Sequence, residues 1–410
     1  MDKHLHIIAL NIPFPPNYGG VIDIYYKIKA LHQLGVKIIL HCFEYERPQA
    51  EELQNLCERV YYYKRKTGII SNLSILPYNV KSRISKELVQ NLLKDTYPIL
   101  GEGLHTFYYL QDQRFANRYK VFRECNIEHN YYQALAQATS FGIKKLFYLI
   151  ESIKFKLYEK QIQKADLIIA VSQTDTEYLK KLFPNNVIDF VPCFHANDQL
   201  NIIPGKSDYL LYHGKLSVEE NEKAALFLIK NVYAHLPYTC IIAGMSPTPA
   251  LYEAAASYPN IKIEANPSQQ RMDELIKNAH IHTLVTFQGT GLKLKLLNSL
   301  FSGRFIVANS LMLNGSNLED LCHIANTSKE FISICDKLMQ QPFDIEEIEN
   351  RKKKLFPFFS NQFQAERICR RIFNAQQLTT EKFPPLYNSV ANRRASADHH
   401  SIEADQYPWE

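Results

Sequence analysis

The stretch GTGLKLKLLNSLFSGR, residues 289–304, lies between two apolar runs and decides how the second half of the chain is interpreted. Residues 282–287 precede it and residues 305–309 follow it, and both runs are typical of buried strands. The glycine-flanked loop between them opens a helix that carries Lys293 and Lys295 in its first turn. Backbone N–H groups and the positive end of the helix dipole attract phosphate there. Because acidic residues usually favour a first helical turn, two lysines indicate a bound anion.

The same alternation of apolar strand and amphipathic helix runs through both halves of the chain. In the first half it predicts strands at 6–11, 36–43, 120–126 and 167–172, and helices at 21–34, 50–57 and 131–164, the last broken near Gly142. In the second half it predicts strands at 209–214, 239–243 and 261–264, and helices at 219–233, 249–257 and 270–278. This alternation predicts an α/β fold with two Rossmann-like domains that face each other across a cleft at the carboxyl ends of their sheets.

The length of 410 residues suits two domains and a tail. We place the domains at residues 1–198 and 199–378, with a proline-bearing polar hinge at 192–205. The last helix of the second domain is allowed, as an alternative, to pack back on the first domain. Residues 379–410 have little apolar periodicity, and we expect them to be disordered; they contain the single tryptophan, Trp409.

The composition restricts the class of protein. A hydrophobic fraction of 46% is enough for two cores, and no apolar run is long enough for a transmembrane helix. The amino terminus has no secretory leader pattern, and the eight cysteines are scattered singly, so we expect a reducing cytoplasm and neither a zinc site nor disulfides. A net charge of +5 suits small anionic substrates and does not indicate nucleic-acid binding.

The stretch at 289–304 resembles the donor-sugar loop of bacterial GT-B glycosyltransferases of family 4, which reads roughly Gly-x-Gly-x-Lys-x-Lys-Leu-Leu-Glu-Ala. The resemblance extends over residues 7–373. Family 4 enzymes often carry two glutamates in this loop, and Thr290 and Asn298 stand at their positions. The resemblance implies that Lys293 stabilises the departing diphosphate. The donor-binding residues that it implies in this loop are Thr290, Gly291, Leu292, Lys295 and Asn298.

Three further loops resemble elements of the same family. Gly19 and Gly20, in PFPPNYGGV at 13–21, resemble the glycine loop that approaches the donor phosphate, although such a loop is more often only a tight turn. Gly214 and Lys215, in HGKLSVEEN at 213–221, resemble the element that grips the diphosphate. The loop at 266–272 resembles the one that contacts the nucleotide base; its candidate residues are Asn266, Ser268 and Met272.

The basic element at 213–221 departs from the family at one position, because Glu220 stands where the relatives carry a second basic residue. The sequence also allows an ordinary helix start there, with Ser217 as N-cap and Glu220 completing a capping box. Both interpretations are compatible, since the cap would order the turn that presents Lys215.

The segment NIEHNYY at 126–132, together with Arg123, resembles a family 4 segment in which a histidine often contacts the transferred sugar. Cys125 stands in place of that histidine. Glu128 and His129 are then the candidate catalytic residues, alongside Lys215 and Lys293. A histidine after a strand is otherwise commonly a structural residue.

Metal and membrane sites are less clearly indicated. His280 and His282 flank a strand without a carboxylate at useful spacing, so we expect no metal and no cofactor. The apolar residues of the helix at 144–164, among them Leu146 and Ile153, favour core packing, although lysines along it leave a peripheral membrane role open. The basic run at 64–66 is more typical of a solvated turn than of lipid contact.

The resemblance implies a cytoplasmic hexosyltransferase that moves a sugar from a UDP- or GDP-sugar to a glycan or lipid-linked acceptor in cell-surface polysaccharide synthesis. The implied chemistry retains the configuration of the sugar and uses no metal. The first domain would lie on the acceptor side. Peripheral contact with the inner face of the membrane is left open. Two alternatives remain, a sugar-nucleotide epimerase and a catalytically silent GT-B module that binds a partner or glycan. The silent module is favoured by the substitutions at Cys125, Glu220, Thr290 and Asn298.

Overall fold

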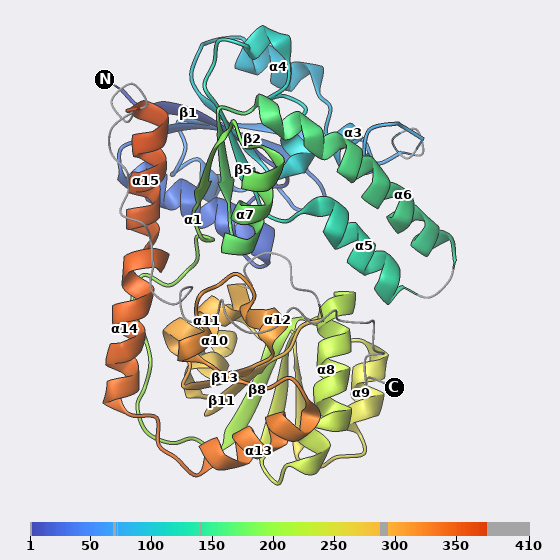
Figure 1. The fold of residues 1–410 in the computed structure, drawn as a ribbon, viewed down its shortest axis with the longest axis vertical. Helices are drawn as coiled ribbons and strands as arrows, with labels where there is room; N and C mark the ends of the chain where they lie inside the picture. Colours follow the sequence, from blue (N-terminus) through green and yellow to red (C-terminus); the bar gives the residue numbers. More distant parts are fainter. Residues whose placement is uncertain (1, 69–70, 72, 140–141, 288–293, 375–410) are drawn as a thin grey trace, which may run out of the picture. The chain divides into compact units, whose positions relative to one another are not determined.

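The computed structural model describes residues 2–68, 71, 73–139, 142–287 and 294–374. Residues 1–373 form one compact unit that contains two parallel β-sheets (Figure 1). The predicted disordered tail at 379–410, with Trp409, lies outside the described residues. The domain boundaries at 198 and 378 remain predictions.

The first sheet has seven parallel strands in the order β3-β2-β1-β4-β5-β6-β7. The order reverses between β1 and β4, which is the position where ligands bind in doubly wound sheets. The strands are β1 His4–Ala9, β2 Lys37–Glu44, β3 Arg59–Lys64, β4 Ile99–Glu102, β5 Lys120–Glu124, β6 Leu167–Ala170 and β7 Val187–Phe190. The helices are α1 Gly19–Gln33, η1 Glu51–Leu53, α3 Tyr78–Lys81, α4 Lys86–Leu92, η2 Leu104–Thr106, η3 Gln113–Phe115, α5 Glu128–Ala138, α6 Ile143–Tyr158, η4 Glu159–Lys164 and α7 Gln173–Leu182.

The second sheet repeats this arrangement with six parallel strands in the order β10-β9-β8-β11-β12-β13, and it reverses between β8 and β11. The strands are β8 Tyr209–Lys215, β9 Thr239–Met245, β10 Ile261–Ala265, β11 Ile281–Leu284, β12 Phe305–Ala308 and β13 His323–Ile324. The helices are α8 Glu219–Asn231, η5 Tyr233–His235, α9 Pro249–Ala255, α10 Gln269–Asn278, α11 Leu294–Ser302, α12 Ser310–Leu313, η6 Glu319–Leu321, α13 Ser328–Met339, α14 Ile345–Phe359 and α15 Asn361–Phe373. The predicted α/β fold with two Rossmann-like sheets is confirmed.

Each sheet is buried on both faces, because successive residues of a strand point to opposite sides. Along β1, Leu5 and Ile7 belong to one apolar cluster and Ile8 belongs to the cluster on the other face. The second sheet is likewise enclosed by separate clusters on its two faces. These cores hold the loops at the carboxyl ends of the strands in fixed positions.

The last described helix, α15, belongs to the first sheet's core. Ile368 and Ile372 of α15 are buried in the cluster that contains Ile24 and Ile28 of α1. Arg371 forms an ion pair with Asp189 of β7, with Nε 2.7 Å from Oδ2. The chain therefore returns to its first sheet after completing the second (Figure 1).

One element prediction is wrong, and strands β3, β4, β7 and β13 were not predicted. The segment 50–57 forms only the short 3₁₀ helix η1, because β3 begins at Arg59 and leaves little room for a longer helix. In β4 and β7 the short apolar runs are interrupted by Gly101 and Asp189, so they gave no clear strand signal. None of the described helices has the length and apolar character needed to cross a bilayer.

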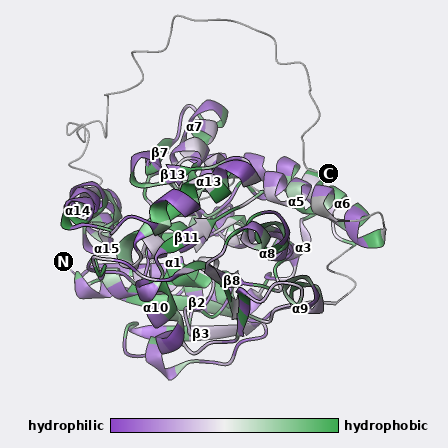
Figure 2. Cartoon of the chain, turned by 90° about the horizontal axis from the view of Figure 1, so that it is seen from below, coloured by the Kyte–Doolittle hydropathy of each residue, from purple (hydrophilic) through white to green (hydrophobic). Residues whose placement is uncertain are grey.

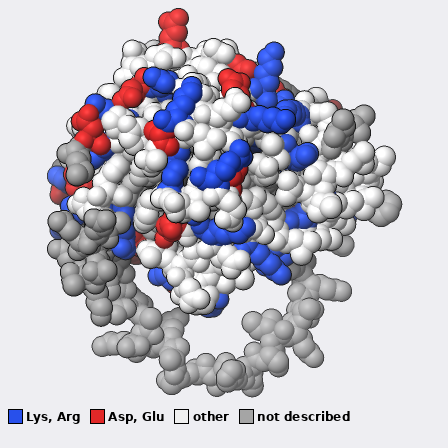
Figure 3. All heavy atoms as spheres, turned by 90° about the horizontal axis from the view of Figure 1, so that it is seen from above, with Lys and Arg blue, Asp and Glu red and all other residues white. Residues whose placement is uncertain are grey.

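Charge is distributed unevenly on the surface. Figure 3 shows a face on which lysine and arginine side chains gather near the middle. This agrees with the net charge of +5 and with a preference for anionic ligands.

Candidate functional site

Strands β8 and β9 each have a glycine one residue before their last, which brings their backbones close together at this end of the sheet. Gly214 pairs with Gly244 in the parallel register. A Cβ at Gly244 would lie 1.7 Å from the carbonyl oxygen of Gly214, so a larger residue does not fit there. The N–H of Leu216 donates to the carbonyl of Met245 at 2.8 Å. These contacts fix the turn that contains Gly214 and Lys215.

Lys295, in the first turn of α11, points to this turn. Its Nζ donates to Oδ1 of Asn221 at 2.6 Å and to the hydroxyl of Tyr212 at 3.2 Å. A Cβ at Gly214 would lie 3.3 Å from the same Nζ, so the ammonium group rests against the glycine. The fold therefore brings together two of the predicted donor-binding residues, Gly214 and Lys295.

Asn221 links the three elements around this ammonium group. Its side-chain Nδ2 donates to the backbone carbonyl of Lys215 at 3.0 Å, while its Oδ1 accepts from Lys295. Burial raises the pKa of the neighbouring Tyr212, so that hydroxyl stays neutral. Neither Asn221 nor Tyr212 was predicted as a site residue, although Asn221 closes the 213–221 stretch and that position was a usable signal.

His213 precedes the glycine and adds a second polar group at the same position. Its ring is buried, and burial lowers its pKa well below the ordinary value, so it stays neutral. Within the described parts of the chain, neither ring nitrogen has a hydrogen-bond partner. Buried polar atoms normally have hydrogen-bond partners, so two ring nitrogens without one next to Gly214 are typical of a ligand site.

The predicted capping box at the start of α8 is wrong. The helix begins at Glu219 with Val218 as N-cap, and no side chain caps it. Ser217 lies one residue too early for the role. Glu220 instead accepts a hydrogen bond from the hydroxyl of Thr286, which follows β11. Lys215 ends β8 with an exposed side chain.

The most characteristic part of the predicted donor loop cannot be placed. Thr290, Gly291, Leu292 and Lys293 lie outside the described residues. The phosphate role of Lys293 therefore remains a prediction. The helix that the loop was predicted to open is present as α11 from Leu294 onward.

Asn298, on α11, has a protein partner. Its Oδ1 accepts from Nδ2 of Asn197 at 3.1 Å. Asn197 belongs to the segment that connects the two sheets. This hydrogen bond ties the carboxamide at the family's second glutamate position to the predicted hinge.

The three residues predicted to contact a nucleotide base have structural contacts. Oδ1 of Asn266 accepts from the N–H of Ser246 at 2.8 Å, and the φ of Asn266 is 49°. Ser268 is the N-cap of α10 and accepts from the N–H of Arg271 at 3.2 Å. Met272 packs against a small apolar cluster below the helix. Base contacts through backbone groups of this loop are compatible with these roles.

In the first sheet, Gly19 and Gly20 begin α1 at the carboxyl end of β1. No side chain caps this helix start. A Cβ at Gly19 would lie 3.7 Å from Cδ1 of Leu294, the first residue of α11. The predicted glycine loop therefore lies beside the helix that carries Lys295.

Glu128 is the first residue of α5 and is buried. Burial raises the pKa of its carboxyl group to about 8, while the Arg83 guanidinium acts in the opposite direction. Nε2 of His105 lies 3.7 Å from Oε2 of Glu128. Arg83 donates to the carbonyl of Leu10, just after β1, at 2.8 Å. Glu128 thus shares its surroundings with the loops that follow β1 and β4.

His105 and Arg83 were not predicted as site residues. His105 follows β4, and its buried Nδ1 has no hydrogen-bond partner among the residues described. Burial lowers its pKa well below the ordinary value. No sequence signal connects these two residues with Glu128, because the fold alone brings the three segments together.

His129 lies apart from Glu128, although the two are adjacent in sequence. Its Nε2 is 3.3 Å from Nζ of Lys156, and its Nδ1 is 3.4 Å from Oε1 of Glu159. It lines an open groove of about 620 Å³ between α5 and α6. Of the two predicted residues, only Glu128 faces the loops at the sheet's switch point.

Arg123 and Cys125 belong to a buried ionic cluster beneath these loops. Nη2 of Arg123 lies 3.1 Å from Oδ1 of Asp23, and its Nη1 donates to the carbonyl of Val191 at 2.5 Å. Lys27 contacts Asp23 at 2.9 Å. The Arg123 and Lys27 charges hold the pKa of the Asp23 carboxyl well below its usual range against the effect of burial. Arg123, which matches the family segment, therefore joins β5 to α1 and to the connecting segment.

This cluster also contains the donor set with the best geometry for a metal in the described part of the chain. Asp23, Glu102 and Cys125 each bring one potential ligand atom within 4.8 Å of the others. However, Nζ of Lys27 lies 2.9 Å from Oε1 of Glu102 as well as from Asp23. A lysine ammonium group thus occupies the position between the two carboxylates, and the donor set fits a metal poorly.

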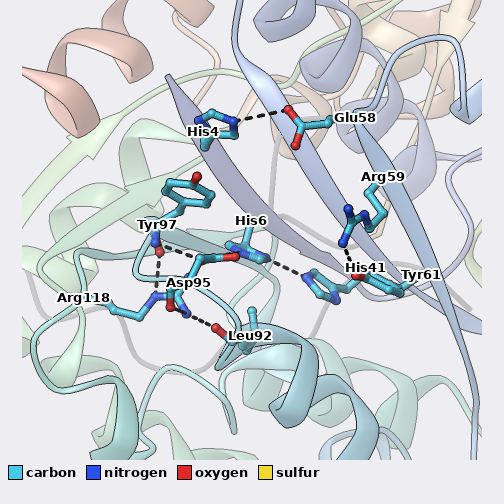
Figure 4. Close-up of polar contacts among 10 residues, drawn as sticks. All are labelled: His4, His6, His41, Glu58, Arg59, Tyr61, Leu92, Asp95, Tyr97 and Arg118. Carbon is cyan, nitrogen blue, oxygen red and sulfur yellow. Dashed lines mark hydrogen bonds and ion pairs between the residues drawn. The ribbon is translucent and has the colours of Figure 1, made fainter. Parts of the chain in front are cut away.

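A second group of buried polar residues crosses the first sheet from β1 to β2 and β3 (Figure 4). Nδ1 of His6 is 2.8 Å from Nε2 of His41, and Nε2 of His6 is 2.9 Å from Oδ1 of Asp95. Nδ1 of His41 is 2.8 Å from the hydroxyl of Tyr63. Because each ring nitrogen of His6 and His41 has a protein partner, we assign this network to stability.

Comparisons with known proteins agree with the topology. No family model matches the chain. A curated relative, the "uncharacterized 44.6 kDa protein in cps region" of Klebsiella pneumoniae, is 23% identical over 390 residues, which cover 90% of this chain and 98% of that protein.

Several solved structures share this architecture over most of their length. Sucrose-phosphate synthase from Thermosynechococcus elongatus has a TM-score of 0.69 at 14% identity, covering 91% of this chain and 100% of that one. TarM has a TM-score of 0.65 at 10% identity, and the match covers 91% of this chain and 99% of TarM. Trehalose-6-phosphate synthase from E. coli, bound to UDP-2-fluoro glucose, has a TM-score of 0.60 at 10% identity. The match covers 90% of this chain and 99% of that one. The chain has the GT-B fold. At these identities the likeness establishes the GT-B architecture, and the activity has to be argued from the site.

Proposed function

We propose that this GT-B protein is a glycosyltransferase that moves a sugar from a UDP- or GDP-sugar to a glycan or lipid-linked acceptor. The observation that carries the proposal is the Lys295 ammonium group held against Gly214. This point lies where β8 and β11 diverge, and doubly wound sheets bind nucleotides at such a switch point. A fixed cation beside a glycine turn suits the diphosphate of a nucleotide-sugar.

The proposed chemistry is stabilisation of the departing diphosphate. As the bond between the sugar and the diphosphate breaks, negative charge grows on the phosphate oxygens. Lys295 and Lys215, with Lys293 from the loop outside the described residues, supply positive charge to them. A preorganised group of this kind is worth about 3 kcal/mol. The proposal requires no metal, and retention of configuration is the outcome we expect.

On the side of the first sheet, Glu128 and His105 are the groups that we assign to the sugar or the acceptor. A carboxyl group with a pKa of about 8 is mostly protonated at neutral pH, so Glu128 donates a hydrogen bond there. His105 stays neutral and offers Nδ1. His129, on the groove between α5 and α6, contacts the acceptor rather than the transferred sugar.

The biological setting that we propose is bacterial cell-surface polysaccharide synthesis. The supporting observation is the relative whose name places it in a cps region. An acceptor carried by a lipid requires the enzyme to work at the inner face of the membrane, and peripheral contact there is part of the proposal.

Thermal unfolding in the presence of UDP, GDP and their sugars tests donor binding, because a ligand of the folded state raises its apparent stability. We expect one nucleotide series to raise the Tm and the other to leave it unchanged. No shift with either series would refute the proposed function. Product analysis of the binding nucleotide-sugar without acceptor then separates the alternatives. An epimerised nucleotide-sugar indicates an epimerase, and binding without turnover with any acceptor supports the silent module.

A further inference from the structure

Helix α6 packs on the protein through one side only. Phe155 and Tyr158 are buried on that side, and the Phe155 ring lies 5.0 Å from that of Tyr132. The buried carboxylate of Glu151 accepts from the N–H of Tyr78 at 2.6 Å. These contacts fix the orientation of the helix without using its outer side.

The outer side of α6 carries a second row of apolar residues, which we call the α6 stripe. Its members recur every three or four residues, so they share one face of the helix. They are Ile143, Leu146, Ile150, Ile153 and Leu157, whose exposed fractions are 89%, 58%, 43%, 63% and 61%. We expected the last four of these side chains to be core residues, and that prediction is wrong, because Phe147, Phe155 and Tyr158 make the helix's packing contacts instead. Figure 2 shows hydrophobic and hydrophilic residues mixed along this helix.

The exposed charges of helix α6 itself are positive, although Nζ of Lys144 lies 3.5 Å from the carboxylate of Glu219 on α8. Helix α6 contains four lysines, at positions 144, 145, 154 and 156, and Lys160 follows it with an exposed side chain. Its single acidic residue, Glu151, is fully buried, accepts from the N–H of Tyr78, and forms an ion pair with Lys154 at 2.9 Å. Glu159, just after the helix, is also buried and accepts from the hydroxyl of Tyr178 at 2.8 Å. The exposed surface of the helix is therefore apolar and cationic.

Two more exposed apolar residues lie on the segment that leads into α3. Leu73 and Ile75 are 82% and 95% exposed. The segment ends at Tyr78, whose backbone is bonded to Glu151 and whose ring lies 6.3 Å from that of Phe147. Apolar side chains are thus exposed beside α6 as well as on it.

We propose that the α6 stripe docks the protein on the surface of a bilayer that contains anionic phospholipids. The apolar side chains enter the boundary between headgroups and acyl chains, and the lysines contact the phosphates. A second copy of the chain suits this surface less well, because it would bring two sets of lysines together. The groove that contains His129 opens along the same helix, between Ile153, Leu157 and the polar side of α5. This inference rests on the proposed function only in assigning that groove to a lipid-linked acceptor.

Vesicle flotation with the full chain tests the docking. The probes are vesicles of phosphatidylcholine alone and vesicles with about one third phosphatidylglycerol. The test variant is Leu146→Glu with Ile150→Glu, which changes the stripe outside the groove. The matched control is Tyr252→Glu with Ile345→Glu, because these residues are 47% and 68% exposed on other helices.

We expect the unchanged chain and the control to float with anionic vesicles, and the stripe variant to bind them at least about tenfold more weakly. Added salt should weaken the binding of the unchanged chain. An unchanged chain that ignores anionic vesicles, or a stripe variant that binds as well as the control, would overturn the proposal. A dimer that the stripe variant converts to a monomer would overturn it as well.

Two further measurements separate folding and donor binding from docking. The stripe variant should unfold at the Tm of the control, because the replaced side chains are exposed. It should also keep the nucleotide-induced rise in Tm, because the two replaced side chains are exposed and neither belongs to the residues that we assign to the donor. If the unchanged chain binds vesicles but no nucleotide, the proposed function is refuted and the docking surface stands.

Discussion

The ammonium nitrogen of Lys295 lies 2.6 Å from the side-chain oxygen of Asn221. This bond joins the first turn of α11 to the first turn of α8, the two helices that begin on either side of the second sheet's switch point. A positive charge is thereby held beside Gly214 before any ligand arrives. Preorganised charge of this kind is what transition-state stabilisation requires.

Replacement of Lys295 tests that role. We expect Lys295→Met to lower turnover by roughly tenfold or more, because the variant loses a charge that acts on the departing diphosphate. Asn221→Ala should have a smaller effect in the same direction, since it frees the ammonium group without removing it. Initial rates with a saturating acceptor measure both, and Lys329→Ala, at an exposed position on α13, is the matched control.

Lys293→Ala provides an independent test of the loop that the structure does not describe. We expect a loss of roughly tenfold or more, because the sequence places a second charge near the diphosphate. An unchanged rate would remove Lys293 from the proposed mechanism and leave the assignment of Lys295 standing.

The gain in stability from Glu128→Gln over the unchanged chain should grow as the pH rises. The folded carboxyl group has a pKa of about 8, against an ordinary value of 4.5. Between these values the folded state holds a proton that the unfolded state has lost, so the contribution of Glu128 to stability falls with rising pH. The variant removes this penalty, which is on the order of 2–4 kcal/mol at pH 7.

Denaturant titrations at several pH values between 5 and 8 measure this difference. Glu253→Gln, on an exposed side chain, is the control. A constant difference between Glu128→Gln and the unchanged chain over this range would contradict the assigned pKa. The activity of the unchanged chain should also decline as the pH rises through 8, since Glu128 then loses the proton that it donates.

The buried pair His6 and His41 predicts that stability depends on pH in the opposite direction. Burial lowers the pKa of His41 well below 6.5 and also lowers that of His6. Below pH 6.5 the unfolded chain gains protons that the folded chain does not, so stability should fall as the pH drops from 7 to 5. His41→Gln should reduce that fall while costing about 1–2 kcal/mol at pH 7 through imperfect hydrogen bonds.

Urea unfolding at pH 5, 6 and 7 checks the histidine prediction. His235→Gln serves as the control, because its side chain is exposed. If both variants show the same pH dependence as the unchanged chain, His41 does not titrate as its burial implies.

Gly303, in the sequence stretch that opens into α11, should not tolerate a side chain. A Cβ there would lie 2.0 Å from Nε2 of the buried His282 and 2.9 Å from the carbonyl oxygen of Ser299. We expect Gly303→Ala to destabilise the protein by about 2–4 kcal/mol. Thermal or chemical unfolding measures this loss, and Gly68→Ala, which meets nothing within 4 Å, should leave stability nearly unchanged.

The architecture could be predicted from the sequence because its signals are local. An apolar run that is followed by a glycine turn indicates a strand and the loop after it, as in β8 with Gly214. The same reasoning found Lys295 as a cation at a helix start. It was wrong about Ser217, because the exact first residue of a helix depends on neighbours such as Thr286, which is far away in sequence.

The parts that could not be predicted depend on which segments the fold brings together. Arg83, His105 and Glu128 come from three separate segments and meet only after β1, β4 and β5 are arranged in the sheet. The α6 stripe was assigned to the core because periodicity identifies an apolar face without showing what covers it. Glu128 and His129 are neighbours in sequence, yet a helix start directs them to different surroundings.

The return of α15 to the first sheet affects how the chain is made. Ala365, Ile368 and Ile372 supply one wall of the cluster that also holds Leu5 and Ile7. While a ribosome synthesises the protein, that wall is missing until the whole second sheet has been made. The amino-terminal half therefore waits with part of its interior open to water, and the two halves complete their folding together rather than one after the other.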